Sequence, residues 1–85
     1  MVVRFQWIEW NLAKIARHGL SPDEVEAAWR HRFGDDEYEH ARGPYFESYG
    51  PVPSGRVIKI VWRWASQGVV EVVFVITAYG NWRRR

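Results

Sequence analysis

The sequence predicts an α+β fold in which two short N-terminal helices pack on one face of a twisted antiparallel sheet of about four strands. Three observations support this prediction. Helical periodicity is confined to the first part of the chain, apolar and polar residues alternate strictly in the last part, and turn-forming residues connect the two without a long linker. A chain of 85 residues is large enough for one core, so residues 1–85 are expected to form a single domain.

The first two elements are a strand and a helix. A β-prone run at residues 2–7 predicts the strand. Residues 9–17 predict a helix that ends before Gly19, which suits a left-handed C-terminal cap. The apolar stripe of this helix, with the spacing i, i+4, i+7 and i+8, consists of Ile8, Leu12, Ile15 and Ala16.

A second helix is predicted to start immediately afterwards. Ser21 is a strong N-cap, Pro22 suits the first helical position, and Glu24 completes a capping box with the serine. Two short helices joined so closely are not stable alone in water, so they need a sheet to pack against. The buried stripe of the second helix is predicted to be Val25, Ala28, Trp29 and Phe33.

The sheet is predicted from the second half of the chain. Residues 45–49 suit a short strand, and the ranges 55–65 and 69–79 form a hairpin around a tight turn at residues 66–68. The face turned toward the helices is predicted to carry Ile58, Ile60, Trp62, Trp64, Val70, Val72, Phe74, Ile76 and Ala78. The other face, open for contact, is predicted to carry Val57, Lys59, Val61, Arg63, Val69, Glu71, Val73, Val75, Thr77 and Tyr79.

Charge is distributed unevenly along the chain, although the net charge is only +2. Residues 22–50 contain eight acids and three arginines, hence −5, whereas the remaining positions carry +7. Such a dipolar chain can offer a basic surface to phosphates and an acidic one to a basic protein. The alternative is that these charges only solvate ordinary surface faces.

Cysteine and hydropathy exclude several classes of protein. The chain contains no cysteine, which excludes a disulfide framework, a thiolate zinc site and a thiol nucleophile. Its longest apolar run, Val72 to Ile76, is far shorter than the roughly 20 residues that span a bilayer. We therefore expect a cytoplasmic protein that has no membrane partner.

Several motifs together resemble a known family. They are Phe5 and Trp7, then Asn11 and Lys14, the stretch RHGLSPDEVEAAW, an acidic run ending at His40, Tyr49-Gly50, Ser54-Gly55-Arg56 and Val75-Ile76-Thr77-Ala78. In these motifs and in its order of elements the chain resembles the BrnT-type toxins of bacterial type II toxin–antitoxin pairs. The resemblance implies a fold like that of the RelE and ParE toxins and metal-independent cleavage of mRNA without a cofactor. It also implies neutralisation by a cognate antitoxin, as a hetero-oligomer.

The chain departs from this family at its C-terminal end. The family continues as Ser-Ala-Arg and then a charged helix, whereas this sequence reads Thr77-Ala78-Tyr79-Gly80 and ends five residues later. The resemblance therefore implies either a ribonuclease or a degenerate relative that lacks the C-terminal helix.

Candidate catalytic residues follow from the chemistry that the resemblance implies. Such a ribonuclease needs a base for the ribose 2′-hydroxyl, an acid for the leaving oxygen and cations for the phosphorane. His40 suits proton transfer and matches the loop histidine of the family, with Arg42 beside it. Arg63 on the open sheet face and Tyr79, at the position of the family's arginine, complete the predicted catalytic set.

The other basic residues are assigned to RNA binding, and no metal site is expected. The predicted RNA-binding residues are Arg56, Lys59, Arg83 and Arg84. The alternative for Lys59 and Arg63 is that they merely keep the open face soluble. For His18 the alternative to a catalytic role is capping of a carbonyl in the turn between the helices, and for His31 it is a place at the C-terminal end of a helix. The three histidines lack the spacing of a zinc site.

A second hypothesis is a protein-binding module without catalysis. The apolar residues expected on the open face favour burial by a partner protein or by a second copy of the chain. Of the tryptophans, those on the helix-facing side are expected to fill the core, whereas Trp10 and Trp82 are less easily buried and could make contacts.

Overall fold

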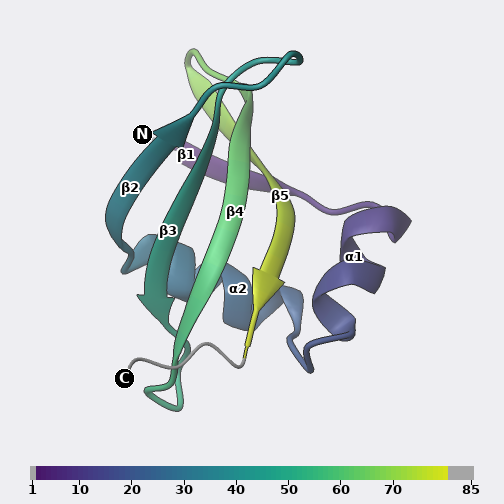
Figure 1. Ribbon diagram of the computed structural model, residues 1–85, viewed down its shortest axis with the longest axis vertical. Helices are drawn as coiled ribbons and strands as arrows, with labels where there is room; N and C mark the ends of the chain where they lie inside the picture. The colour runs from purple at the N-terminus through teal and green to yellow at the C-terminus, as the bar shows by residue number, and fades with distance from the viewer. Residues whose placement is uncertain (1, 81–85) are drawn as a thin grey trace.

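The computed structural model describes residues 2–80 and has an α+β fold, with two helices and a five-stranded sheet in this range (Figure 1). The predicted α+β class and the two N-terminal helices are confirmed. Within the same residues, neither helix is long and apolar enough to cross a membrane. The elements in chain order are β1 (Val2–Gln6), α1 (Glu9–Ala16), α2 (Pro22–Arg30), β2 (Phe33–Tyr38), β3 (Tyr45–Pro51), β4 (Val57–Ser66) and β5 (Val70–Tyr79).

The sheet differs from the predicted four-stranded antiparallel sheet in two ways. Its order is β1-β5-β4-β3-β2, and β1 runs parallel to β5, so the sheet is mixed. β1 and β5 are far apart in the sequence, and parallel strands are not connected by a short turn, so no turn motif in the sequence could indicate this pairing. The additional strand, β2, has the acidic sequence FGDDEY and is exposed at every position. Its low β propensity is overridden by antiparallel pairing with β3.

Helix α2 begins as predicted. The Ser21 hydroxyl accepts a hydrogen bond from the Glu24 backbone N–H at 3.2 Å, and the Ser21 N–H donates to the Glu24 carboxylate at 2.9 Å. The prediction that Phe33 extends the buried stripe of this helix is wrong. The helix ends at Arg30, and Phe33 starts β2, where it is 56% exposed and stacks on Tyr49.

Helix α1 lies beside β5, whereas α2 lies behind the sheet (Figure 1). The apolar stripe predicted for α1 is only partly correct. Ile15 is buried, but Leu12 is exposed and Asn11 is completely buried. Since β1 stops at Gln6, the next part of β5 lacks a strand partner on that side, and Asn11 Nδ2 donates to the Val75 carbonyl at 3.0 Å. The same amide donates to the Gln6 carbonyl, so a buried polar side chain satisfies the strand edge where an apolar one could not.

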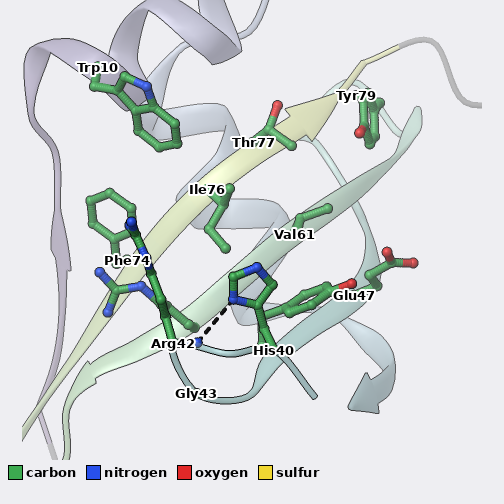
Figure 2. A pocket seen from close by; sticks show the side chains of 12 residues that line it. Trp10, His40, Arg42, Gly43, Glu47, Val61, Phe74, Ile76, Thr77 and Tyr79 are labelled. Atoms are coloured by element: carbon green, nitrogen blue, oxygen red, sulfur yellow. Dashed lines mark hydrogen bonds between the residues drawn. The ribbon is translucent and has the colours of Figure 1, made fainter. Parts of the chain in front are cut away.

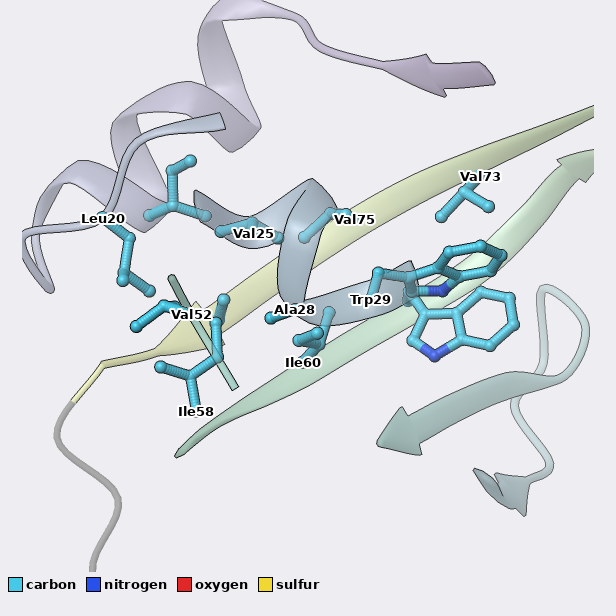
Figure 3. Close-up of a cluster of buried hydrophobic side chains, with 12 residues drawn as sticks. Leu20, Val25, Ala28, Trp29, Val52, Ile58, Ile60, Val73 and Val75 are labelled. Atoms are coloured by element: carbon cyan, nitrogen blue, oxygen red, sulfur yellow. The ribbon is translucent and has the colours of Figure 1, made fainter. Parts of the chain in front are cut away.

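The core lies between the helices and one face of the sheet (Figure 3). The alternation predicted for β4 is confirmed, since Ile58, Ile60 and Trp62 are all at most 1% exposed. Trp62 also starts a chain of two hydrogen bonds. Its Nε1–H donates to the Ser48 hydroxyl at 2.9 Å, and that hydroxyl donates to Asp35 at 2.6 Å. This chain ties β2 to the core.

The faces predicted for β5 are wrong over much of the strand because of a β-bulge. Val61 pairs with Thr77 but Trp62 pairs with Val75, which leaves Ile76 as an extra residue on β5. One extra residue reverses the alternation. Val73 and Val75, predicted to be outward, are therefore buried core residues, whereas Ala78 is inward as predicted. The residues predicted to be inward that do not join the core cluster are Val70, Val72, Phe74 and Ile76.

Candidate functional site

The sheet face opposite the core carries a groove of about 770 Å³, which we call the open-face groove (Figure 2). Strands β3, β4 and β5 form its floor, α1 contributes one wall, and the loop between β2 and β3 forms the other. It is lined by Trp10, His40, Arg42, Gly43, Tyr45, Glu47, Val61, Arg63, Phe74, Ile76, Thr77 and Tyr79.

The loop that carries His40 and Arg42 is held by short-range hydrogen bonds. The Arg42 backbone N–H donates to His40 Nδ1 at 3.1 Å, and the Gly43 N–H donates to the His40 carbonyl at 2.9 Å. Gly43 has a φ of +110°, a conformation that favours glycine. Because Nδ1 faces the loop backbone, Nε2 is the ring nitrogen left to exchange a proton with a bound ligand.

The two arginines of the groove keep their charge unpaired. Arg63 is exposed, and its guanidinium carbon lies 4.7 Å from the centre of the Phe74 ring. Within residues 2–80, neither Arg63 nor Arg42 forms an ion pair. A planar guanidinium without a carboxylate partner is well suited to bind a phosphate group.

The acidic residue of the groove, in contrast, is already neutralised. Glu47 on β3 forms an ion pair of 2.9 Å with Lys59 on β4, and each side chain is less than a quarter exposed. The hydrogen bond that Lys59 donates to Glu47 raises the pKa of Lys59 above its ordinary value of 10.5, against the opposing effect of burial. Glu47 therefore does not cancel the positive charge of the two arginines.

Glu47 also raises the pKa of a tyrosine on the neighbouring strand β2. Tyr38 on β2 stacks on Tyr45, with ring centres 5.3 Å apart. The negative charge of Glu47 is the main reason that the pKa of Tyr38 is raised above 10.0, with smaller contributions from burial and from Asp36. Tyr38 thus remains a neutral hydrogen-bond donor at any physiological pH.

We expect Glu47→Gln to lower the pKa of both Lys59 and Tyr38, because the charge that raises each is removed. NMR titration of the two side chains measures this directly. The raised lysine pKa means that the ion pair stabilises the fold fully below pH 10.5 and that this contribution is lost as the pH rises through the folded-state pKa. The variant should therefore lose up to about 1 kcal/mol at neutral pH but not at strongly alkaline pH.

The matched control is Glu37→Gln, on the strand next to β3. Glu37 contributes to neither raised pKa. If both substitutions moved the two pKa values equally, the assignment to Glu47 would be wrong.

The four residues predicted to be catalytic all line the open-face groove. His40 and Arg42 come from the loop between β2 and β3, Arg63 from β4 and Tyr79 from β5. The structure thus brings together residues from three separate segments of the chain. Their catalytic roles stay predictions.

The residues predicted to bind RNA are placed less uniformly. Lys59 lies on the open face, where its ammonium is engaged in an ion pair. Arg56 does not line the groove, because it lies near the turn between β3 and β4 with its guanidinium beside Gly80. Arg83 and Arg84 lie outside the described residues.

The other two histidines do not line the groove. His18 packs edge-on against Tyr79, with ring centres 5.3 Å apart, and His31 is the C-cap residue of α2. Among the described residues, no group of three His, Asp or Glu side chains could hold a metal ion.

Two groove residues, Tyr45 and Glu47, were missed as site residues by sequence reasoning. The strand they occupy alternates between these side chains and the inward-facing Phe46 and Ser48. That alternation was the available signal, because it separates polar outward positions from packed inward ones. Trp10, which the sequence marked as a contact residue, does line the groove.

Comparison with known proteins finds no match, either to a protein-family model or to a curated protein.

Proposed function

We propose that the protein is the toxin component of a bacterial toxin–antitoxin pair and that its open-face groove cleaves mRNA without a metal ion. The observation that carries this proposal is the convergence of His40, Arg42, Arg63 and Tyr79 on one groove. An imidazole can transfer protons, and two unpaired guanidinium groups and a phenol can stabilise the charge of a phosphorane. The resemblance to BrnT-type toxins supports the same function.

The proposed reaction needs no co-reactant. The ribose 2′-oxygen attacks the adjacent phosphorus, and the bond between phosphorus and the 5′-oxygen breaks. Glu47, the carboxylate in the groove, accepts the 2′-hydroxyl proton. His40 acts in its doubly protonated form, in which Nδ1 no longer accepts the Arg42 N–H, and it passes the Nε2 proton to the leaving 5′-oxygen and becomes a neutral imidazole. The products are a 2′,3′-cyclic phosphate and a 5′-hydroxyl end.

The remaining residues stabilise the charge that develops in the transition state. Arg42 and Arg63 contribute two positive charges that no described carboxylate neutralises. Preorganised positive charge at this point is the largest single contribution to many reactions of this type. Tyr79 donates a hydrogen bond to a phosphate oxygen from the far end of the groove.

The test is incubation of the purified protein with unstructured RNA, in the presence and absence of EDTA. We expect cleavage in both conditions, with 2′,3′-cyclic phosphate ends detected by mass spectrometry. A substrate with 2′-deoxyribose at every position should remain intact, because it lacks the nucleophile. Intact RNA after incubation with folded protein, or cleavage that EDTA abolishes, would contradict the proposal.

A second candidate function, a non-catalytic protein-binding module, is supported by the edge strand β2. Among the described residues it is the last strand of the sheet and pairs only with β3, and all six of its positions are exposed. An edge of this kind can accept a strand from a partner protein, such as an antitoxin. The RNA assay separates the two candidates, since a degenerate relative would keep this edge but would leave RNA intact.

A further inference from the structure

One wall of the open-face groove is a half-exposed tryptophan with a defined position. Trp10 on α1 is 48% exposed, and its ring is nearly parallel to that of Phe74, at 12° and 6.0 Å between centres. Phe74 is only 8% exposed and is anchored in β5. Phe74 thus supports Trp10, which remains about half exposed.

Positive charge surrounds this aromatic pair. The Lys14 ammonium lies 4.8 Å from the centre of the Trp10 ring, and the Arg63 guanidinium lies over Phe74. An aromatic surface flanked by cations is the combination that binds single-stranded nucleic acid, because the bases stack while the phosphates pair with the cations.

A second aromatic group lies on the opposite side of the groove. Tyr45 stacks on Tyr38 at 5.3 Å, and His40 meets Tyr45 edge-on at 6.3 Å. Two strand spacings, about 10 Å in total, separate β5 from β3. Arg63, which pairs with Phe74 and lies on β4 between these two strands, is therefore located between the two aromatic groups.

We propose that the open-face groove binds single-stranded RNA across the strands, with one base stacked on Trp10, a following base against Tyr45, and the phosphate between them held by Arg42 and Arg63. This inference rests on the proposed function and names its substrate class. A duplex is excluded as substrate because its bases are already stacked and paired. Recognition is independent of base identity, because every base offers an aromatic face.

The experiment measures binding separately from cleavage. A fluorescein-labelled RNA hexamer with 2′-O-methyl groups cannot be cleaved, and its affinity is measured by fluorescence anisotropy at low salt. We expect Trp10→Ala to weaken binding between about 5-fold and about 150-fold, the loss of one stacked base. Trp10→Phe should lose less, and a 2′-O-methyl duplex should bind much more weakly than the single strand.

The matched control is Leu12→Ala, which removes another exposed apolar side chain from the same helix but not from the groove. Thermal unfolding checks that each variant is folded. If Trp10→Ala fails to fold, quenching of tryptophan fluorescence by the hexamer in the wild type and in Trp10→Phe still tests the proposal, because only the wild type should be strongly quenched.

The outcomes distinguish the two proposals. Cleavage of RNA together with equal hexamer affinity of wild type, Trp10→Ala and Leu12→Ala would overturn the stacking proposal and leave the proposed function standing. Hexamer binding that depends on Trp10, without cleavage of unmodified RNA, would overturn the proposed function and leave the stacking proposal standing. Failure of the wild type to bind the hexamer would also overturn the stacking proposal and would favour a protein as the occupant of this surface.

Discussion

Replacement of Gly50 by alanine is expected to destabilise the protein by at least about 3 kcal/mol, the upper end of the usual cost of overpacking a core. Gly50 lies on β3 where the backbone of α2 crosses the sheet. A Cβ atom at this position would lie 2.0 Å from the Ala28 carbonyl oxygen and 2.8 Å from its carbonyl carbon. Because the obstacle is backbone rather than a flexible side chain, α2 would have to move away from the sheet.

The consequence is large because α2 carries much of the core. Val25, Ala28 and Trp29 are all at most 5% exposed, and a shift of the helix would disturb each of them. For a domain of this size a loss of about 3 kcal/mol lowers the midpoint of thermal unfolding by more than about 10 °C. Circular dichroism melting curves measure the shift.

Gly68→Ala is the matched control for this prediction. Gly68 lies in the turn between β4 and β5, and a Cβ atom there would meet nothing within 4 Å. We expect this variant to melt within a few degrees of the wild type. Equal melting temperatures for the two variants would show that α2 and β3 are not in close contact at Gly50.

Arg63→Ala is expected to reduce RNA cleavage by about 100-fold or more, the effect of removing one preorganised charge from a developing oxyanion. Arg63 is exposed on β4 and its guanidinium lies over the Phe74 ring, so its loss should change stability little. Cleavage rates are measured under single-turnover conditions with protein in excess. Arg63→Lys should be intermediate, because it keeps the charge but not the planar pair of donors.

Arg30→Ala provides a close control, since Arg30 also lies over a phenylalanine ring. Its guanidinium is 5.2 Å from the Phe5 ring centre and it pairs with Glu26, but it does not line the groove. Its rate should match that of the wild type. A decrease of less than threefold in Arg63→Ala, or an equal decrease in Arg30→Ala, would remove Arg63 from the proposed mechanism.

Sequence patterns predicted the structure correctly where the stabilising interactions are made between residues close together in the sequence. The start of α2 is an example, because the serine and the glutamate of the capping box, Ser21 and Glu24, hydrogen-bond each other's backbone across three residues. The alternation of β4 is another, because burial on one face needs only the period of the strand. Both features were predicted and both are confirmed.

Predictions failed where a distant segment decides the environment of a residue. Asn11 is buried because β1 ends before β5 does, and no property of α1 reveals this. The burial of Val75 follows from the bulge at Ile76, which is visible only in the register of β5 against β4. Strand β2 forms in spite of its acidic sequence because β3 offers an edge to pair with.

By itself the sequence determined the helical N-terminal part, the start of α2, the core face of β4 and the residue types available for chemistry. Only the tertiary structure decided that β1 joins β5 in parallel and that His40 and Tyr79 face the same groove. The physical reason is that caps and alternation are stabilised by residues close in sequence, whereas strand order, bulges and grooves are set by contacts between segments far apart in the chain.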